Sequence, residues 1–125
     1  MTARPFPKSA RLLTTADFDR VFQEKCSSSD QLLIVYCAAN GLDETRLGMV
    51  VSKKVGNAPT RNRWKRLIRE AFRLSRDKAP AGVDLVVLPR KEAKPTLAGL
   101  SASLVNLARR NARRLAQRGA QGEAP

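Results

Sequence analysis

Apolar residues recur at helical spacing in three stretches of this chain and at strand spacing in three others. Amphipathic helices are predicted at residues 15–24, 58–76 and 96–117. Strands rich in β-branched side chains are predicted at residues 32–39, 46–54 and 83–88. The last of these strands is strongly apolar, so we expect it at the centre of the sheet. The 125 residues are enough for one hydrophobic core but not for two.

The chain divides into three parts by composition. Residues 1–13 combine cations with prolines and show little periodicity, so we expect an extended basic arm, anchored by Phe6, Leu12 and Leu13. Residues 14–118 hold all the predicted elements and form the single domain. Residues 119–125 are small and polar, which predicts a disordered tail.

The first predicted helix carries aromatic residues on one side. Thr14 precedes it as a capping hydroxyl, and Asp17 suits the positive end of the helix dipole. Phe18 and Phe22 recur at a spacing that by itself predicts core packing. Tyr36, in the next strand, has a hydroxyl that needs a partner if buried, which favours a position in a cleft or at an edge.

The second predicted strand alternates and then ends in two lysines. Leu47, Met49 and Val51 fall on one face, because successive side chains of a strand point to opposite sides. The other face carries Arg46, Val50 and Ser52, and the strand is expected to end at Lys53 and Lys54.

The helix predicted at residues 58–76 has an apolar side and a cationic side. Asn57 is the expected cap, and Pro59 is tolerated in the first turn, which has no N–H partners to lose. The apolar stripe consists of Trp64, Leu67, Ile68, Ala71 and Phe72. The opposite side gathers Asn62, Lys65, Arg66, Arg69, Arg73 and Arg76.

The charge balance bears on what this helix does. Lys and Arg number 24 against 11 Asp and Glu, giving a formal net charge of +13, while hydrophobic residues make up an ordinary 42%. A solvated cationic face is the simplest interpretation, but such faces usually intersperse acids, and here only Glu70 and Asp77 are available. RNA, DNA or an anionic membrane would neutralise the surplus, and nucleic acid is favoured.

Other classes of function are disfavoured. No apolar run approaches the roughly 20 residues needed to span a bilayer, and the N-terminus lacks a signal-peptide core, so we expect a cytoplasmic protein with no membrane partner. The chain has no histidine and only Cys26 and Cys37, which predicts no metal site and two reduced thiols. Phosphate-loop, dinucleotide and nucleophile motifs are absent, so no catalytic residue is expected on the protein.

One run of residues resembles a known family. It reads Arg46-Leu47-Gly48, then Val51-Ser52-Lys53-Lys54-Val55-Gly56-Asn57-Ala58, then Arg61-Asn62-Arg63, Lys65-Arg66 and Arg69-Glu70. This run closely resembles the protein subunit of bacterial ribonuclease P. The resemblance implies a two-layer α+β fold of order αβββαβα, similar to ribosomal S5 domain 2. It further implies a four-stranded sheet, a left-handed βαβ crossover through the basic helix, and a short strand near residues 25–28.

The resemblance also implies a function. Members of that family assist a catalytic RNA that removes the 5′ leader from precursor tRNA, with Mg²⁺ held on the RNA and no cofactor bound by the protein alone. The expected partners are ribonuclease P RNA and precursor tRNA, and not DNA. The residues implied to contact the catalytic RNA are Lys53, Lys54, Asn57, Arg61, Asn62, Arg63, Lys65, Arg66 and Arg69. The residues implied to line a cleft for the single-stranded leader are Phe18, Phe22, Tyr36, Arg46, Val50 and Ser52.

Two rival interpretations remain at this point. A small ribosomal-type RNA-binding protein without a processing role would show the same charge and fold. A DNA-binding protein reading the major groove is disfavoured, because recognition helices offer a few polar side chains to base edges rather than a row of arginines.

Overall fold

The computed structural model describes residues 10–90 and 93–122, and its elements follow the order αβββαβα. They are α1 (Thr15–Gln23), β1 (Ser27–Ser29), β2 (Leu33–Ala39), β3 (Arg46–Met49), the 3-10 helix η2 (Lys53–Val55), α2 (Ala58–Ser75), β4 (Val83–Pro89) and α3 (Leu97–Gly122). None of the helices within these residues is long and apolar enough to cross a bilayer.

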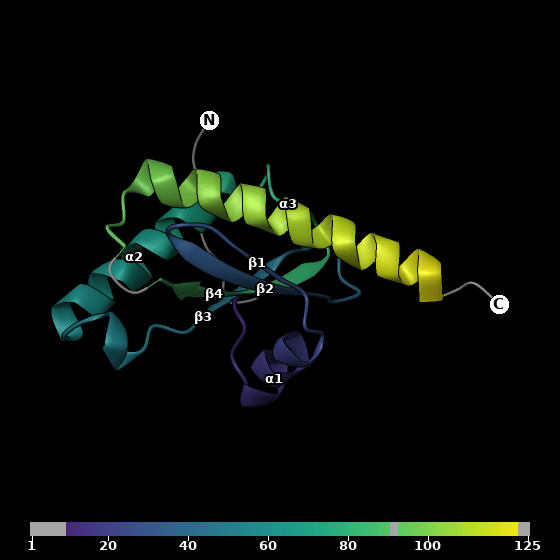
Figure 1. The fold of residues 1–125 in the computed structure, drawn as a ribbon, viewed down its shortest axis with the longest axis horizontal. Coiled ribbons are helices and arrows are strands. Elements are labelled where there is room, and N and C mark those ends of the chain that lie inside the picture. Colours follow the sequence, from purple (N-terminus) through teal and green to yellow (C-terminus); the bar gives the residue numbers. More distant parts are fainter. Residues whose placement is uncertain (1–9, 91–92, 123–125) are drawn as a thin grey trace.

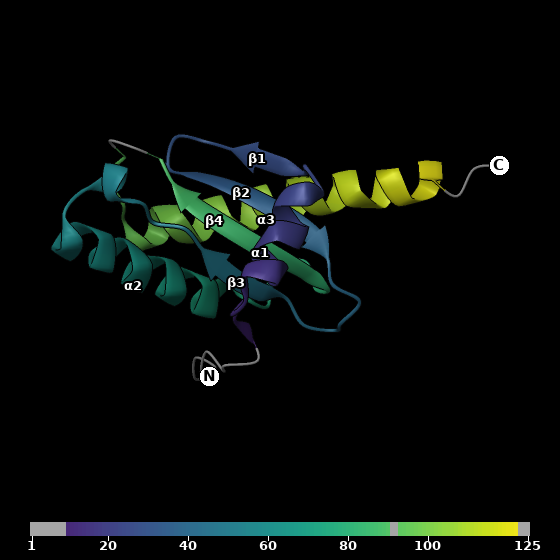
Figure 2. The same cartoon turned by 90° about the horizontal axis from the view of Figure 1, so that it is seen from below.

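The four strands form one mixed sheet in the order β1-β2-β4-β3. β2 pairs antiparallel with both β1 and β4, whereas β3 pairs parallel with β4. The predicted central position of β4 is therefore confirmed. α2 connects the two parallel strands through a left-handed crossover, which Figures 1 and 2 show together and which departs from the strong right-handed preference of such units.

Helices cover the two faces of the sheet unequally. α2 and α3 form a layer on one face, while α1 crosses one end of the other face (Figures 1 and 2). The larger core lies under α2 and α3 and includes Trp64, Ile68 and Phe72 from α2, as the apolar stripe predicted. A smaller cluster under α1 contains Val21 and Val86.

The predicted helix caps are confirmed. The Thr14 hydroxyl accepts a hydrogen bond from the Asp17 amide at 3.1 Å, and the Asn57 side chain accepts one from the Thr60 amide at 3.0 Å. Each bond satisfies an N–H that has no partner within its helix. The starts of α1 and α2 are therefore fixed by local sequence.

β3 is shorter than predicted, and Pro89 explains why. The last bond of the parallel ladder runs from the Val50 amide to the Val87 carbonyl at 3.0 Å. The next would run from the amide of residue 89 to the Val50 carbonyl, and proline has no amide hydrogen. The strand ends at Met49, and Lys53 and Lys54 stand in η2 instead of in the predicted strand.

The two ends of the domain also differ from expectation. α3 continues to Gly122, through the start of the predicted disordered tail, and residues 123–125 lie outside the described part. In the predicted arm, Leu12 is buried and its amide bonds the Leu47 carbonyl at 3.0 Å, which pins it beside β3. Leu13 is 60% exposed and does not anchor the arm, and Phe6 lies outside the described residues.

α3 is held to the sheet by polar groups that are themselves buried. The Asn111 side chain donates to the Val35 carbonyl at 2.8 Å and accepts from the Ser28 hydroxyl at 2.5 Å.

Both cysteines are free and buried, and burial raises the pKa of the Cys37 thiol to about 12. These thiols stay protonated, so their role is packing.

The closest approach of α1 to β3 depends on Gly48. A Cβ atom at this position would lie 2.7 Å from Cζ of Phe18 and 3.1 Å from Cβ of Leu12. We expect Gly48→Ala to push Phe18 away and to lower the free energy of unfolding by about 1–3 kcal/mol, as overpacking does. Urea unfolding would measure this loss.

Gly119→Ala is the matched control, because a Cβ atom there meets nothing within 4 Å. It should leave stability unchanged or raise it slightly, since alanine favours helix. Equal stability of the Gly48→Ala and Gly119→Ala proteins would show that Phe18 does not pack this closely on β3.

Candidate nucleic-acid interface

A row of cationic side chains begins in η2 and continues along α2. Lys53 and Lys54 are exposed just before Asn57 caps the helix. Arg63, Arg66 and Arg69 are exposed on α2. The remaining predicted RNA-contacting residues of this row are Arg61 and Lys65, which are half-buried, and Asn62, which is exposed. All nine predicted residues therefore lie in η2, at the Asn57 cap or in the first part of α2, and their contact with RNA stays a prediction.

Most of this positive charge is not neutralised by the protein itself. The acidic residue Glu70 pairs with Arg73, and Arg76 stacks over the Phe72 ring at 5.8 Å from its centroid. Among the residues that the structure describes, no carboxylate lies within 4.0 Å of the side-chain nitrogens of Arg63, Arg66 or Arg69. Unpaired cations at this density attract a polyanion.

Aromatic side chains meet on the opposite face of the sheet, under α1. The Phe22 and Tyr36 rings pack edge to face with centroids 4.9 Å apart, and Phe18 packs against Gly48. All three aromatic residues are only half-buried. The helical spacing predicted core for Phe18 and Phe22, and the structure shows both packed against the smaller cluster but only partly buried.

A second apolar row continues beyond the part of the sheet that α1 covers. Tyr36 of β2 pairs with Val86 of β4. Ile34, two residues before Tyr36, pairs with Leu88. Val50, whose amide bonds the neighbouring Val87 carbonyl, extends this row on the β3 side and is 37% exposed. Ile34 and Leu88 are half-buried. The aromatic cluster thus opens onto a partly exposed apolar strip.

The two surfaces are joined by a short stretch of chain. Val50 belongs to the apolar row, Ser52 is exposed, and Lys53 begins the cationic row. A single nucleic-acid assembly contacting both surfaces would therefore pass over residues 50–57.

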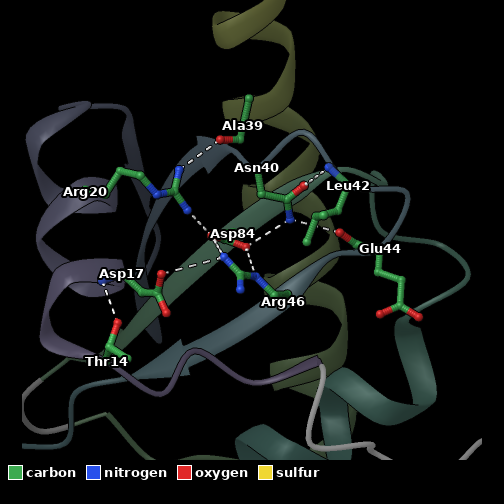
Figure 3. Close-up of polar contacts among 9 residues, drawn as sticks. All are labelled: Thr14, Asp17, Arg20, Ala39, Asn40, Leu42, Glu44, Arg46 and Asp84. Carbon is green, nitrogen blue, oxygen red and sulfur yellow. Dashed lines mark hydrogen bonds and ion pairs between the residues drawn. The ribbon is translucent and has the colours of Figure 1, made fainter.

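A buried carboxylate holds the polar end of the α1 face together (Figure 3). Asp84 is fully buried at the start of β4 and accepts from Nε and Nη2 of Arg46 at 2.8 and 2.7 Å. Asn40 donates to it at 2.9 Å, and Arg20 of α1 forms a further ion pair. Four elements or loops meet at this one side chain.

Comparison with known proteins now decides the family. The family model described as "Ribonuclease P" matches residues 6–112. This chain belongs to the ribonuclease P protein family.

Individual relatives agree with this assignment. The chain is 44% identical over 87 residues to the ribonuclease P protein component of Thermotoga petrophila, covering 70% of this chain and 74% of the relative. It is 39% identical over 107 residues to that of Clostridioides difficile, covering 84% of this chain and 94% of the relative.

Solved structures in the family share the fold. The ribonuclease P protein of Thermotoga maritima superposes with a TM-score of 0.73 at 37% identity, covering 80% of this chain and 96% of that one. The Staphylococcus aureus protein gives a TM-score of 0.71 at 36% identity, covering 82% and 94%. The α+β architecture expected from the resemblance is therefore shown by both sequence and structure.

In this chain, the Asp84 cluster is the part of the site that the sequence did not reveal. A lone aspartate in an apolar strand was the available signal, since a buried carboxylate requires cationic partners. Arg46, predicted to face a leader, directs its guanidinium to Asp84 and lies 3.8 Å from a carboxylate oxygen of Asp17. Its contact with a leader stays a prediction.

The ionisation of Asp84 makes the stability of the fold sensitive to acid. Burial acts to raise its pKa, but hydrogen bonds from Arg46 and Asn40 and the charges of Arg46 and Arg20 outweigh this and hold the pKa below the ordinary value. A depressed carboxyl pKa stabilises the fold above the unfolded-state pKa of about 3.9, and this stabilisation is lost as the pH falls through the folded-state pKa.

We expect Asp84→Asn to lower stability near neutral pH, because both arginines lose their counter-charge. Removing one partner of a buried ion pair costs roughly 3–5 kcal/mol, and the partial exposure of Arg20 and Arg46 favours the lower end. The difference from the parent should shrink as the pH drops below about 4. Urea unfolding between pH 3 and pH 7 would test this; a difference independent of pH would contradict the ionised state of Asp84.

Proposed function

We propose that this protein binds the catalytic RNA of ribonuclease P through η2 and α2. We propose further that it binds the single-stranded 5′ leader of precursor tRNA through the α1 face and assists removal of that leader in the cytoplasm. The observation that carries the proposal is the unneutralised cationic row of α2, which coincides with the residues matching the family's signature.

The chemistry of the cationic row fits an RNA backbone. Arginine guanidinium groups grip two phosphate oxygens at once, whereas Lys53 and Lys54 provide mobile point charges. The Asn62 amide is exposed beside them and can bond a sugar or a base edge. Contacts of this kind fix the register of a protein on RNA without selecting a sequence.

The chemistry of the α1 face fits unpaired bases. Partly exposed aromatic rings stack on any base, at about 1–3 kcal/mol per stack with little sequence preference. Such a surface suits an enzyme that acts on many different leaders. Phe18, Phe22 and Tyr36 would provide the stacking surfaces, and the apolar row through Val50 would continue the path towards the catalytic RNA.

We assign the hydrolysis itself to the RNA subunit and its Mg²⁺ ions. The chain contains no histidine, the commonest general base. The buried carboxylate of Asp84 already accepts hydrogen bonds from Arg46 and Asn40, so it is not free to act as a base. The part of the protein is to bind, orient and neutralise.

The deciding experiment combines the protein with a bacterial ribonuclease P RNA at low Mg²⁺ and a precursor tRNA with a labelled leader. The proposal expects leader removal at the mature 5′ end to be restored by the protein. Binding to the RNA without restored cleavage would instead support the ribosomal-type alternative, in which the protein has no role in processing.

Two substitutions test the catalytic-RNA surface. Arg63→Ala and Arg66→Ala should each weaken assembly with the RNA and lower the slope of log affinity against log salt by about 0.7–1. Each removes one phosphate contact without disturbing an internal ion pair. Filter binding across a salt series measures both quantities, with Arg113→Ala on α3 as an equal loss of exposed charge. Parallel losses in all three variants would show that only net charge matters.

Tyr36 tests the leader surface. Tyr36→Ala removes a ring that packs on Phe22, and it should weaken precursor tRNA binding by the holoenzyme roughly tenfold while leaving mature tRNA binding unchanged. Tyr36→Phe keeps the ring and should keep most of the affinity.

Val21→Ala is the control for this test, because Val21 is fully buried in the same cluster and lies out of reach of a leader. It destabilises the α1 packing without removing a stacking surface. Equal losses on precursor and mature tRNA in the Tyr36→Ala holoenzyme would assign the effect to folding.

A further inference from the structure

A pocket of about 350 Å³ lies between the start of α2 and the segment that leads into α3. Its size falls within the roughly 300–1,000 Å³ that is typical of sites for small organic groups. Four apolar residues form much of its wall: Val55 of η2, Trp64 of α2, and Ala93 and Pro95 of the segment before α3. We call it the Trp64 pocket. None of these four residues was predicted to contact RNA.

Three polar side chains complete the wall of the Trp64 pocket. Thr60 and Arg63 come from α2, and Lys94 comes from the segment on the other side. All three are exposed, so their polar groups are available to a ligand. Arg63 also belongs to the cationic row of α2. The pocket therefore adjoins the proposed RNA surface and continues it towards the start of α3.

The walls of the Trp64 pocket are set by the fold itself. Gly56 has a φ of 154°, and a Cβ atom at this position would lie 2.9 Å from Cγ2 of Thr60. Glycine thus allows η2 to approach the start of α2 closely. On the other side, the Ala93 amide donates to the Arg90 carbonyl at 3.2 Å, and Ala93 packs against the larger core, to which Trp64 belongs.

The mixture of groups in the wall fits an aromatic base better than a phosphate. Apolar side chains cover the flat face of a base, and polar groups beside them can bond its edge. Lys94 can only donate hydrogen bonds, whereas the Thr60 hydroxyl can donate or accept. A phosphate would bond the cations but would leave the apolar wall without a partner.

We propose that the Trp64 pocket binds one unpaired base of the catalytic RNA. The inference rests on the proposed function and deepens it, because phosphate contacts fix register without reading bases, whereas this pocket selects a nucleotide. Arg63 would hold the phosphate backbone beside that base, and Lys94 would donate to the base edge. Guanine is the base that fits, since it offers O6 and N7 as neighbouring acceptors, while adenine places an amino donor beside N7.

NMR titration of the isolated full-length chain tests the site directly. Trp64 is the single tryptophan of the chain, so its indole N–H gives one signal that reports on the pocket. The probes are GMP, AMP and ribose 5-phosphate, which carries the phosphate without a base. GMP should shift the indole signal and bind at least about fivefold more tightly than either of the others.

The two comparison probes can each overturn part of the proposal. If ribose 5-phosphate binds as tightly as GMP and shifts the indole signal equally, the pocket takes a phosphate and the base assignment is wrong. If AMP matches GMP, the assignment to guanine is wrong.

A substitution that fills the pocket separates a base site from an effect of charge. Ala93→Leu adds volume inside the pocket without changing charge, and it should weaken GMP binding at least about fivefold. Ala116→Leu is the matched control, because it adds the same volume at an exposed position of α3 outside the pocket.

Lys94→Gln provides a second, independent test at an exposed position, and Lys78→Gln is its control for charge. Lys94→Gln should weaken GMP binding and reduce the preference for GMP over AMP. Urea unfolding of every variant identifies any that fail to fold. If the folded Ala93→Leu and Lys94→Gln proteins bind GMP as their controls do, the proposed site is wrong.

Assembly with a bacterial ribonuclease P RNA then tests whether the base belongs to that RNA. Ala93→Leu should weaken assembly at every salt concentration without changing the salt slope, because no phosphate contact is lost. A lowered slope would contradict the assignment to a base. If Arg63→Ala weakens assembly while Ala93→Leu matches Ala116→Leu, the further inference fails and the proposed function stands.

Discussion

The buried carboxylate of Asp84 is the interaction on which the arrangement of the α1 face depends. It lies at the start of the central strand and binds Arg46 of β3, Arg20 of α1 and Asn40 beyond β2 (Figure 3). A buried charge of this kind is stable only while its partners stay in place. The aromatic residues of α1 are therefore positioned by a polar contact at one end and by the Phe18–Gly48 packing at the other.

The sheet separates two surfaces of different chemistry, one cationic and one aromatic. On one face, α2 is held by an apolar stripe and presents cations outward, where a backbone of phosphates can neutralise them. On the other face, the aromatic rings are only partly covered, which suits stacking with the unpaired bases of a single strand. The chain runs from β3 through η2 into α2, so residues 50–57 link the two surfaces.

Charge left unpaired on α2, at Arg63, Arg66 and Arg69, works against the stability of the free protein. Where the chain needs rigidity, it neutralises charge: Asp84 holds Arg46 and Arg20, and Glu24 accompanies Arg118 at 3.6 Å. On the proposed RNA surface of η2 and α2, acids are nearly missing among the described residues. The exception on this surface, Glu70, is paired with Arg73. Stability and binding are thus assigned to different arginines of the same chain.

The sequence by itself determined the helices, their caps, the central strand and the cationic row, because these follow from periodicity, side-chain chemistry and charge within short stretches. It also carried the family resemblance through residues 46–70. Only the tertiary structure decided the partners of Asp84, the early end of β3 opposite Pro89, the extension of α3 and the Trp64 pocket between α2 and residues 93–95. Each of these joins residues far apart in the chain, and a local pattern holds no information about which distant group completes a hydrogen bond or an ion pair.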